Sequence, residues 1–135
     1  MTRPRVLVVG CGFGGLAAVR ALSRAAVEIT LVDRTNHHLF QPLLYQVAAA
    51  SLTAPAIAAP IRHILRRGMA RGNLTVLQAE VVAIDGTARA VQLRDGGRLT
   101  YDHLIVAAGA THSYFGHDEW AAFAPGLKTL ADAFD

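Results

Sequence analysis

Two short apolar runs frame the first part of the chain and predict a strand, a helix and a second strand. Residues 6–9 form the first run and lead into a cluster of glycines, and residues 28–33 form the second run and end on Asp33. Between them, residues 16–25 form a helical run. Because continuous apolar runs suit strands that are buried on both faces, this stretch predicts a βαβ unit of a parallel sheet.

The glycine cluster satisfies the pattern G-x-G-x-x-G at Gly10, Gly12 and Gly15. In this pattern the first glycine allows a sharp turn, the second lets the backbone approach a pyrophosphate, and the third lets the helix pack against the strand. The anion sits at the helix N-terminus, where unbonded N–H groups and the helix dipole favour negative charge. Asp33 suits the ribose hydroxyls of an adenosine, and the adjacent Arg34 leaves NADP open as an alternative.

The middle of the chain changes in pattern. Residues 39–61 carry no formal charge, but three prolines interrupt them, which favours short helices and loops over a membrane span. We predict one helix over residues 42–49 and a second over residues 57–67 that ends at Gly68.

The last part of the chain reads mainly as strands. Four short strand-like runs are separated by turns rich in aspartate and glycine, which predicts an antiparallel meander. These runs are residues 74–77, 81–84, 90–93 and 99–101. A buried strand at residues 104–107 again stops at a glycine, and we expect it beside residues 6–9 at the carboxyl edge of the sheet, where α/β folds bind ligands. Thr129 suits the cap of a final helix over residues 130–134.

The predicted fold class is therefore α/β, with a Rossmann-like parallel sheet, a glycine-rich βαβ unit and an antiparallel β-meander. The length of 135 residues fits one domain, and the end of the chain within its last helix leads us to expect a truncated one. The net charge is +3, but the arginines form no dense run with interleaved aromatics, so no nucleic-acid partner is expected. Four arginines lie close together in the sequence: Arg62, Arg66, Arg67 and Arg71. This group is more typical of a solvated helix face than of a patch for an acidic partner or anionic lipid.

The reactive side chains form no catalytic pattern. Cys11 is the single cysteine, so a disulfide framework, a C-x-x-C redox pair and a cysteine metal site are all excluded, and a reducing compartment is expected. The six histidines match no metal-binding spacing, and no Ser-His-Asp arrangement can be assembled. We predict no catalytic residue and no metal ligand.

Several motifs together resemble the flavoproteins with two dinucleotide-binding domains, and more narrowly the type II NADH:quinone dehydrogenases. The segments that carry the resemblance are residues 8–16, 32–48, 101–110, 113–116 and 126–130. The resemblance implies that residues 1–135 are an incomplete FAD-binding domain that ends before an NADH-binding domain. In such a protein NADH reduces FAD, which passes electrons to a quinone, and we expect residues 1–135 to be inactive alone.

The resemblance also implies which residues contact the cofactor. The glycine loop would bind the FAD pyrophosphate, Asp33 the adenosine ribose, and the backbone of Val81 the adenine. Leu43 belongs to a segment that would lie near the flavin ring. The full set of expected cofactor contacts is Gly10, Gly12, Phe13, Gly14, Gly15, Asp33, Arg34, Leu43, Val81, Ala108 and Gly109.

Two other functions remain open. One is another flavoenzyme of the same superfamily, of the sulfide:quinone or ferredoxin reductase type, although a single cysteine weighs against sulfide chemistry, which needs paired thiols. The other is a stand-alone NAD-sensing regulatory domain, which should continue as repeated βαβ units after Asp33. The expected location is cytoplasmic, with peripheral attachment to the inner membrane only through a C-terminal region beyond these residues. The oligomeric state is left open.

Overall fold

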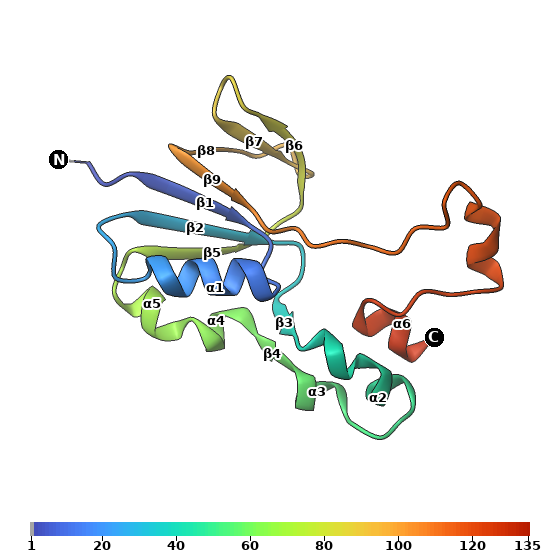
Figure 1. The fold of residues 1–135 in the computed structure, drawn as a ribbon. Helices are drawn as coiled ribbons and strands as arrows, with labels where there is room; N and C mark the ends of the chain where they lie inside the picture. The colour runs from blue at the N-terminus through green and yellow to red at the C-terminus, as the bar shows by residue number, and fades with distance from the viewer. Residues whose placement is uncertain (1) are drawn as a thin grey trace. The chain divides into compact units, whose positions relative to one another are not determined.

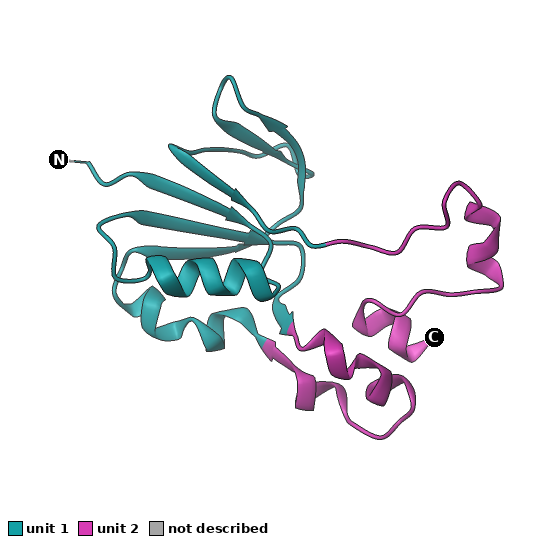
Figure 2. Ribbon diagram, viewed as in Figure 1, with its two compact units in different colours: residues 1–38, 60–109 teal, residues 39–59, 110–135 magenta. Residues whose placement is uncertain are grey.

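The computed structural model describes residues 2–135, and the chain divides into two compact units (Figure 2). Unit 1 comprises residues 1–38 and 60–109, and unit 2 comprises residues 39–59 and 110–135. The predicted glycine loop and all the strands of the main sheet belong to unit 1. Unit 2 consists mainly of short helices and loops.

A four-stranded parallel sheet forms the centre of unit 1 (Figure 1). Its strands are β1 (Arg5–Val9), β2 (Glu28–Asp33), β5 (Leu74–Gln78) and β9 (His103–Val106), in the order β5-β2-β1-β9. In the register, Val8 lies opposite Leu31 on one side and Ile105 on the other. The two strands that lead into glycines, β1 and β9, are therefore neighbours, as the sequence predicts.

Both faces of this sheet are covered, which explains its continuous apolar runs. On one face lie α1 (Phe13–Leu22), α4 (Ile61–Ile64) and α5 (Arg66–Ala70). Val6 and Val8 of β1 point into the core on this side, whereas Leu7 packs with Val91 and Tyr101 on the other side. Each fully buried side chain of this kind contributes about 1.5–3 kcal/mol, so the alternation along β1 stabilises both layers.

The second face is covered by an antiparallel meander of β6 (Val81–Asp85), β7 (Ala90–Leu93) and β8 (Arg98–Thr100). This confirms the predicted meander, but its first predicted strand is wrong. Residues 74–78 form β5, which pairs in parallel with β2 instead. Leu74 and Val76 alternate into the core on the helix face, and this burial outweighs the short sequence distance to β6. A second parallel crossover therefore follows Asp33, which is the continuation expected of a stand-alone NAD-sensing domain.

The helices also differ from their predicted limits. α1 starts at Phe13 and ends at Leu22, three residues before the predicted end, because the Ser23 hydroxyl donates to the carbonyl of Arg20 at 2.8 Å. The helix predicted over residues 57–67 is broken into separate pieces around Pro60, which has no N–H group to donate. Gly68 lies inside α5 and does not end it. A Cβ at Gly68 would come within 3.1 Å of Leu74, so its role is close packing against β5.

Unit 2 has a small core of its own. It contains η1 (Gln41–Leu43), α2 (Leu44–Ala48), α3 (Ala54–Ile57), η2 (Asp118–Ala122) and α6 (Leu130–Phe134). The short strands β3 (His37–Leu39) and β4 (Ala58–Pro60) pair with each other. Leu44, Val47 and Ile57 are buried, and Leu130 packs against them. The prediction that Thr129 caps the last helix is confirmed by a reciprocal capping box with Asp132. Within residues 2–135, none of the helices is both long and apolar enough to cross a membrane.

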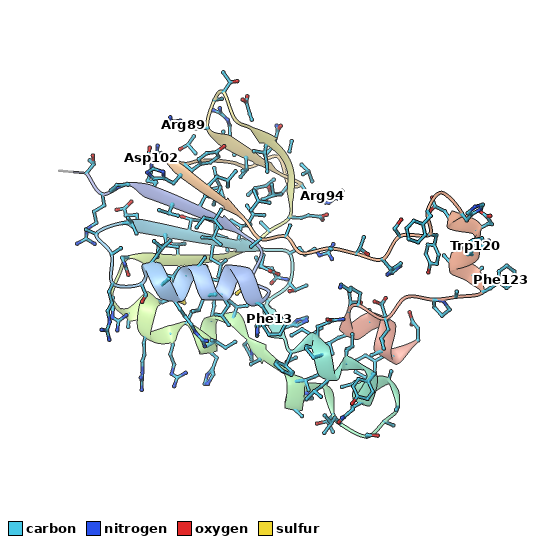
Figure 3. All side chains as sticks on the ribbon, viewed as in Figure 1. Phe13, Arg89, Arg94, Asp102, Trp120 and Phe123 are labelled. Carbon is cyan, nitrogen blue, oxygen red and sulfur yellow. The ribbon has the colours of Figure 1, made fainter. Side chains whose placement is uncertain are left out.

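An ion pair joins Arg5 of β1 to Asp102, the residue that precedes β9. The guanidinium of Arg5 donates to Asp102 Oδ1 at 3.0 Å, and the Arg5 backbone N–H donates to Asp102 Oδ2 at 2.7 Å. Asp102 is labelled in Figure 3. The side-chain hydrogen bond from Arg5 has the larger effect and the backbone one the smaller, and together they lower the pKa of Asp102 to about 2. The unfolded carboxyl has a pKa of about 3.9. The stabilisation is therefore fully present above that value and is lost as the pH falls through about 2.

Replacing Asp102 by asparagine should remove this pH dependence. We expect the free energy of unfolding of the native chain to fall more steeply than that of the Asp102→Asn variant between about pH 4 and pH 2, because only the native chain must protonate this carboxylate. Urea unfolding followed by circular dichroism across this range measures the difference. Parallel curves for the two proteins would show that the ion pair does not stabilise the fold.

Candidate functional site

The first turn of the glycine loop depends on Gly10. It follows β1 directly and has a φ of +95°, a conformation that side chains disfavour. Its N–H donates to the carbonyl of Val32 at 2.8 Å, and the N–H of Ala107 donates to the carbonyl of Val9 at the same distance. A Cβ at Gly10 would clash with the carbonyl oxygen of Ala107. Glycine at this position therefore allows the ends of β1, β2 and β9 to meet.

Gly15 serves the packing of α1 against this turn. A Cβ at Gly15 would overlap the carbonyl of Gly10, which is backbone and cannot move aside. At the neighbouring Gly14, by contrast, a Cβ would meet only the methyl group of Ala107, at an ordinary contact distance of 3.7 Å. Of these two glycines, only Gly15 is required by the fold itself.

Gly12 is the N-cap of α1, and here the space is open. Its carbonyl accepts the N–H of Leu16 at 3.0 Å, so the helix is already established at this point. No side chain caps the helix, its first turn contains no acidic residue, and a Cβ at Gly12 would have no atom within 4 Å. The N-terminal end of the α1 dipole thus faces open space that a diphosphate can fill.

Asp33, at the end of β2, holds the loop in place. Its Oδ2 accepts the backbone N–H of Cys11 at 2.6 Å, and its Oδ1 accepts both the N–H and the hydroxyl of Thr35 at 2.7 Å. A carboxylate offers about four acceptor positions, so room for a ribose hydroxyl remains. The tethering role was missed by the sequence prediction, although Asp33 followed two residues later by Thr35 is a pattern that favours such a turn.

A second contact that the sequence did not predict comes from His38. Its Nδ1 lies 2.8 Å from the carbonyl oxygen of Cys11, and because a carbonyl only accepts, the Nδ1 of His38 is the donor. The ring of His38 also packs perpendicular to that of Phe13, with 5.4 Å between ring centroids. The loop is therefore held on its amide side by Asp33 and on its carbonyl side by His38.

Cys11 itself is a packing residue. Its side chain is 2% exposed and belongs to the core on the helix face. Burial, and secondarily the charge of Asp33, raise the pKa of the Cys11 thiol to about 11. The thiol is therefore protonated at neutral pH, and thiolate chemistry is not available to it.

The other predicted contacts divide between the two units. Arg34 directly follows Asp33, Val81 begins β6, and residues 108 and 109 follow β9, with Gly109 at a φ of +75°. All of these belong to unit 1, together with the glycine loop. Leu43 lies in η1 of unit 2, so its contact with a flavin ring stays a prediction. In unit 2 the rings of Tyr45 and Phe40 are 57% and 44% exposed, so neither ring belongs to the core of that unit.

Removing the Asp33 carboxylate should loosen the loop. In an Asp33→Ala variant the Cys11 N–H loses a charged acceptor, and we expect the free energy of unfolding to fall by about 2 kcal/mol. Urea denaturation measures this loss. Asp95→Ala is the matched control, because Asp95 makes a similar bond to the N–H of Gly97 at 2.8 Å in an exposed turn. Equal losses in the two variants would contradict the tethering role.

Comparison with known proteins adds to this geometry. Residues 4–133 match the family described as pyridine nucleotide-disulphide oxidoreductase. The chain is 55% identical to the type II NADH:quinone oxidoreductase NdhA of Mycobacterium tuberculosis over 98% of its own length and 28% of that protein. NDH2 from Plasmodium falciparum in complex with NADH matches with a TM-score of 0.86 at 23% identity, over 98% of this chain and 27% of that one.

A similar fold also occurs in the sulfide:quinone oxidoreductase from Aquifex aeolicus. The TM-score is 0.82 at 24% identity, and the match covers 96% of this chain and 30% of that one. At such identities the two structures establish a shared fold. The chain spans less than a third of the length of each of these three relatives.

Proposed function

The chain belongs to the pyridine nucleotide-disulphide oxidoreductase family, and we propose that it is the FAD-binding part of a flavin-dependent NADH:quinone oxidoreductase. The observation that carries the proposal is the open N-terminus of α1 at Gly12, which combines a helix dipole, a missing side chain and free space. The identity of 55% to a type II NADH:quinone oxidoreductase supports FAD as the dinucleotide that fills it.

Each part of the site has a proposed role in holding this cofactor. Gly12 and the first turn of α1 receive the pyrophosphate, and Asp33 accepts the ribose hydroxyls with the lone pairs left by its internal bonds. The residues that we propose to contact the rest of the cofactor are Gly10, Phe13, Gly14, Gly15, Arg34, Leu43, Val81, Ala108 and Gly109. Gly10 and Gly15 act indirectly as well, because they fix the path of the backbone.

The bound flavin supplies the hydride and electron chemistry of such an enzyme, while the protein supplies position and electrostatics. Nothing in the proposed role of unit 1 requires a side chain to move a proton. Cys11 is protonated and buried, which argues against electron transfer through this thiol. We therefore assign binding and orientation, but no catalytic step, to the residues of this chain.

NADH and a quinone are the substrates that we propose for the whole protein. Residues 1–135 contain one G-x-G-x-x-G pattern, which we assign to FAD, and the relatives are more than three times longer. This supports residues 1–135 as the domain before an NADH-binding domain, inactive alone. Because quinones dissolve in membranes, we propose a cytoplasmic protein attached peripherally to the inner membrane through a later region.

A sulfide:quinone enzyme is the second candidate, since a structure of that kind shares the fold. Residues 1–135 hold a single, buried cysteine, Cys11, so the paired thiols that sulfide oxidation of that type needs would have to draw on cysteines outside these residues. The identity of 24% to that protein, against 55% to the NADH enzyme, favours the first proposal.

Retention of flavin tests the proposal. The purified chain is incubated with excess FAD, desalted, and examined by visible absorption. We expect about one flavin per chain to remain bound, and we expect an excess of NADH not to displace it. Circular dichroism verifies that the chain is folded. A folded chain that retains no flavin, or that binds NADH in preference, would overturn the assignment of the glycine loop to FAD.

A further inference from the structure

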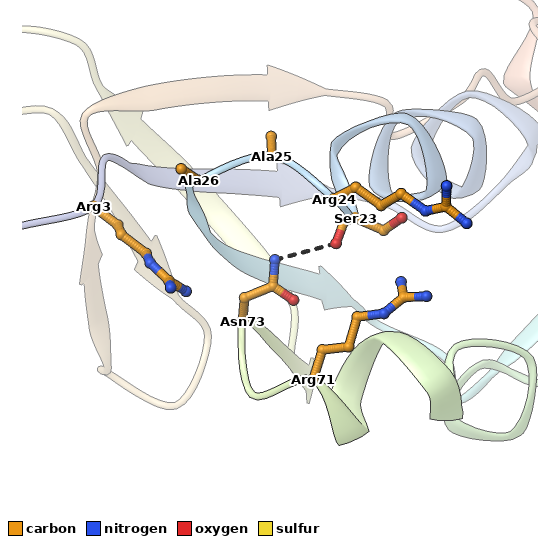
Figure 4. A pocket seen from close by; sticks show the side chains of 7 residues that line it. All are labelled: Arg3, Ser23, Arg24, Ala25, Ala26, Arg71 and Asn73. Atoms are coloured by element: carbon orange, nitrogen blue, oxygen red, sulfur yellow. Dashed lines mark hydrogen bonds between the residues drawn. The ribbon is translucent and has the colours of Figure 1, made fainter.

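A cavity of about 400 Å³ lies at the amino ends of the central strands of unit 1. Its lining comes from the residues before β1, the connection between α1 and β2, and the residues before β5 (Figure 4). The lining residues are Arg3, Ser23, Arg24, Ala25, Ala26, Arg71 and Asn73. Because the glycine loop lies at the carboxyl ends of the same parallel strands, this cavity is separate from the proposed FAD site.

Asn73 is the buried polar group of this cavity. Its side chain is 8% exposed, and its Nδ2 donates to the carbonyl of Ser23 at 3.3 Å. Its Oδ1 is buried and has no hydrogen-bond partner. A buried acceptor without a donor costs stability, so a donor group placed beside Asn73 Oδ1 would stabilise the fold.

Three arginines line the same cavity, and no carboxylate lines it. Within residues 2–135, the side chains of Arg24, Arg71 and Arg3 make no hydrogen bond or ion pair. In Figure 4, Arg24 and Arg71 extend their guanidinium groups in the same direction, and Arg3 extends its own toward Asn73. All three arginines are exposed to solvent, and an anion bound among them would reduce the repulsion between their charges.

The end of α1 does not account for these arginines. A helix C-terminus attracts cations because its last carbonyl groups lack partners. Here the carbonyl of Arg20 accepts from Ser23, that of Leu22 accepts the N–H of Ala25 at 2.9 Å, and that of Ser23 accepts from Asn73. Since these carbonyls are already bonded, Arg24 and Arg71 are available for a ligand.

We propose that this cavity binds a phosphoryl group that retains one O–H, either as inorganic phosphate or as the head group of an acidic lipid. Arg24 and Arg71 take the charged oxygens in the forked geometry that guanidinium groups prefer, with Arg3 as a third cation. The O–H of the ligand donates to Asn73 Oδ1. Sulfate has the same shape but carries no proton near neutral pH, so it cannot make this last bond.

A titration of the full chain with inorganic phosphate tests the proposal. The starting buffer is near neutral pH and free of phosphate, and amide NMR monitors each addition. We expect saturable shifts around Arg24, Arg71 and Asn73, and weaker binding by about tenfold in the double variant Arg24→Gln/Arg71→Gln, since it removes two charge-assisted contacts. The matched control is Arg66→Gln/Arg67→Gln, which removes the same charge from α5 outside the cavity and should leave the affinity unchanged. Sulfate should bind clearly less tightly than phosphate to the native chain.

A second experiment, which measures binding of the chain to lipid vesicles, identifies the source of the phosphoryl group. If phosphatidic acid vesicles bind the chain more tightly than phosphatidylglycerol vesicles of equal charge, and the Arg24→Gln/Arg71→Gln variant loses this preference, the ligand is a lipid head group. If only free phosphate binds with the expected dependence, the ligand is a soluble phosphate. The proposal is overturned if phosphate shows no saturable binding, if sulfate binds equally well, or if the control variant weakens binding as much as the cavity variant.

Discussion

Replacing Gly10 by alanine should cost unit 1 about 3 kcal/mol or more of its free energy of unfolding, a large share of the 5–15 kcal/mol typical of a domain. Two effects add at this position. The φ of +95° is unfavourable for any residue with a side chain, by about 1–2 kcal/mol. In addition, the new methyl group would clash with the carbonyl oxygen of Ala107, so β9 would have to move away from β1.

Gly72→Ala separates these two effects. Gly72 has a φ of +79°, close to that of Gly10, but a Cβ there would have no atom within 4 Å. The free energy of unfolding of this variant should therefore fall only because of the backbone conformation, by about 1–2 kcal/mol. Urea unfolding followed by circular dichroism compares the two variants. Equal losses would show that the close approach of β9 to the Gly10 turn does not limit the residue at this position.

Replacing Gly12 by aspartate should leave the fold intact and abolish binding of FAD. Aspartate is among the best N-cap residues and exceeds glycine by only a few tenths of a kcal/mol, so α1 should be unchanged or slightly more stable. The space around this position is open, so the side chain fits. Its carboxylate, however, occupies the place proposed for the pyrophosphate and repels it, and we expect FAD affinity to fall at least about a hundredfold, as charge repulsion adds to the lost contacts.

The control for this variant adds the same charge elsewhere. Gly86 lies in a turn of the meander, and a Cβ there also has open space, so Gly86→Asp should fold and keep its affinity for FAD. Fluorescence titration of FAD measures both affinities, and circular dichroism verifies the folds. If Gly12→Asp retains the native affinity, the pyrophosphate does not lie at the N-terminus of α1.

The sequence predicted the parts of the fold that depend on local patterns. The βαβ unit from Arg5–Val9 to Glu28–Asp33 follows from two apolar runs around a glycine turn, and the structure confirms it. The comparisons also confirm the resemblance to the flavoprotein family. The glycines of the fingerprint could be assigned because each has a different steric requirement, and the clash distances at Gly10 and Gly15 agree with those requirements.

The errors arose where contacts distant in the chain decide the structure. Residues 74–78 read as the first strand of the meander because the next strand follows closely, but pairing with β2, more than 40 residues earlier, buries Leu74 and Val76. Gly68 reads as a helix end, whereas its true constraint is the nearby side chain of Leu74. The bonds of Asp33 and His38 to Cys11 could not be predicted because they depend on the exact path of the loop.

Mapping by amide NMR tests most directly whether FAD lies across the glycine loop of unit 1, as we propose. On addition of FAD to the labelled chain, we expect the largest shifts at residues 10–16, with further shifts at Asp33, Val81 and residues 107–109. The amides around Asn73 should remain unchanged. Binding of FAD that leaves the amides of residues 10–16 unshifted would show that the cofactor does not lie at the glycine loop.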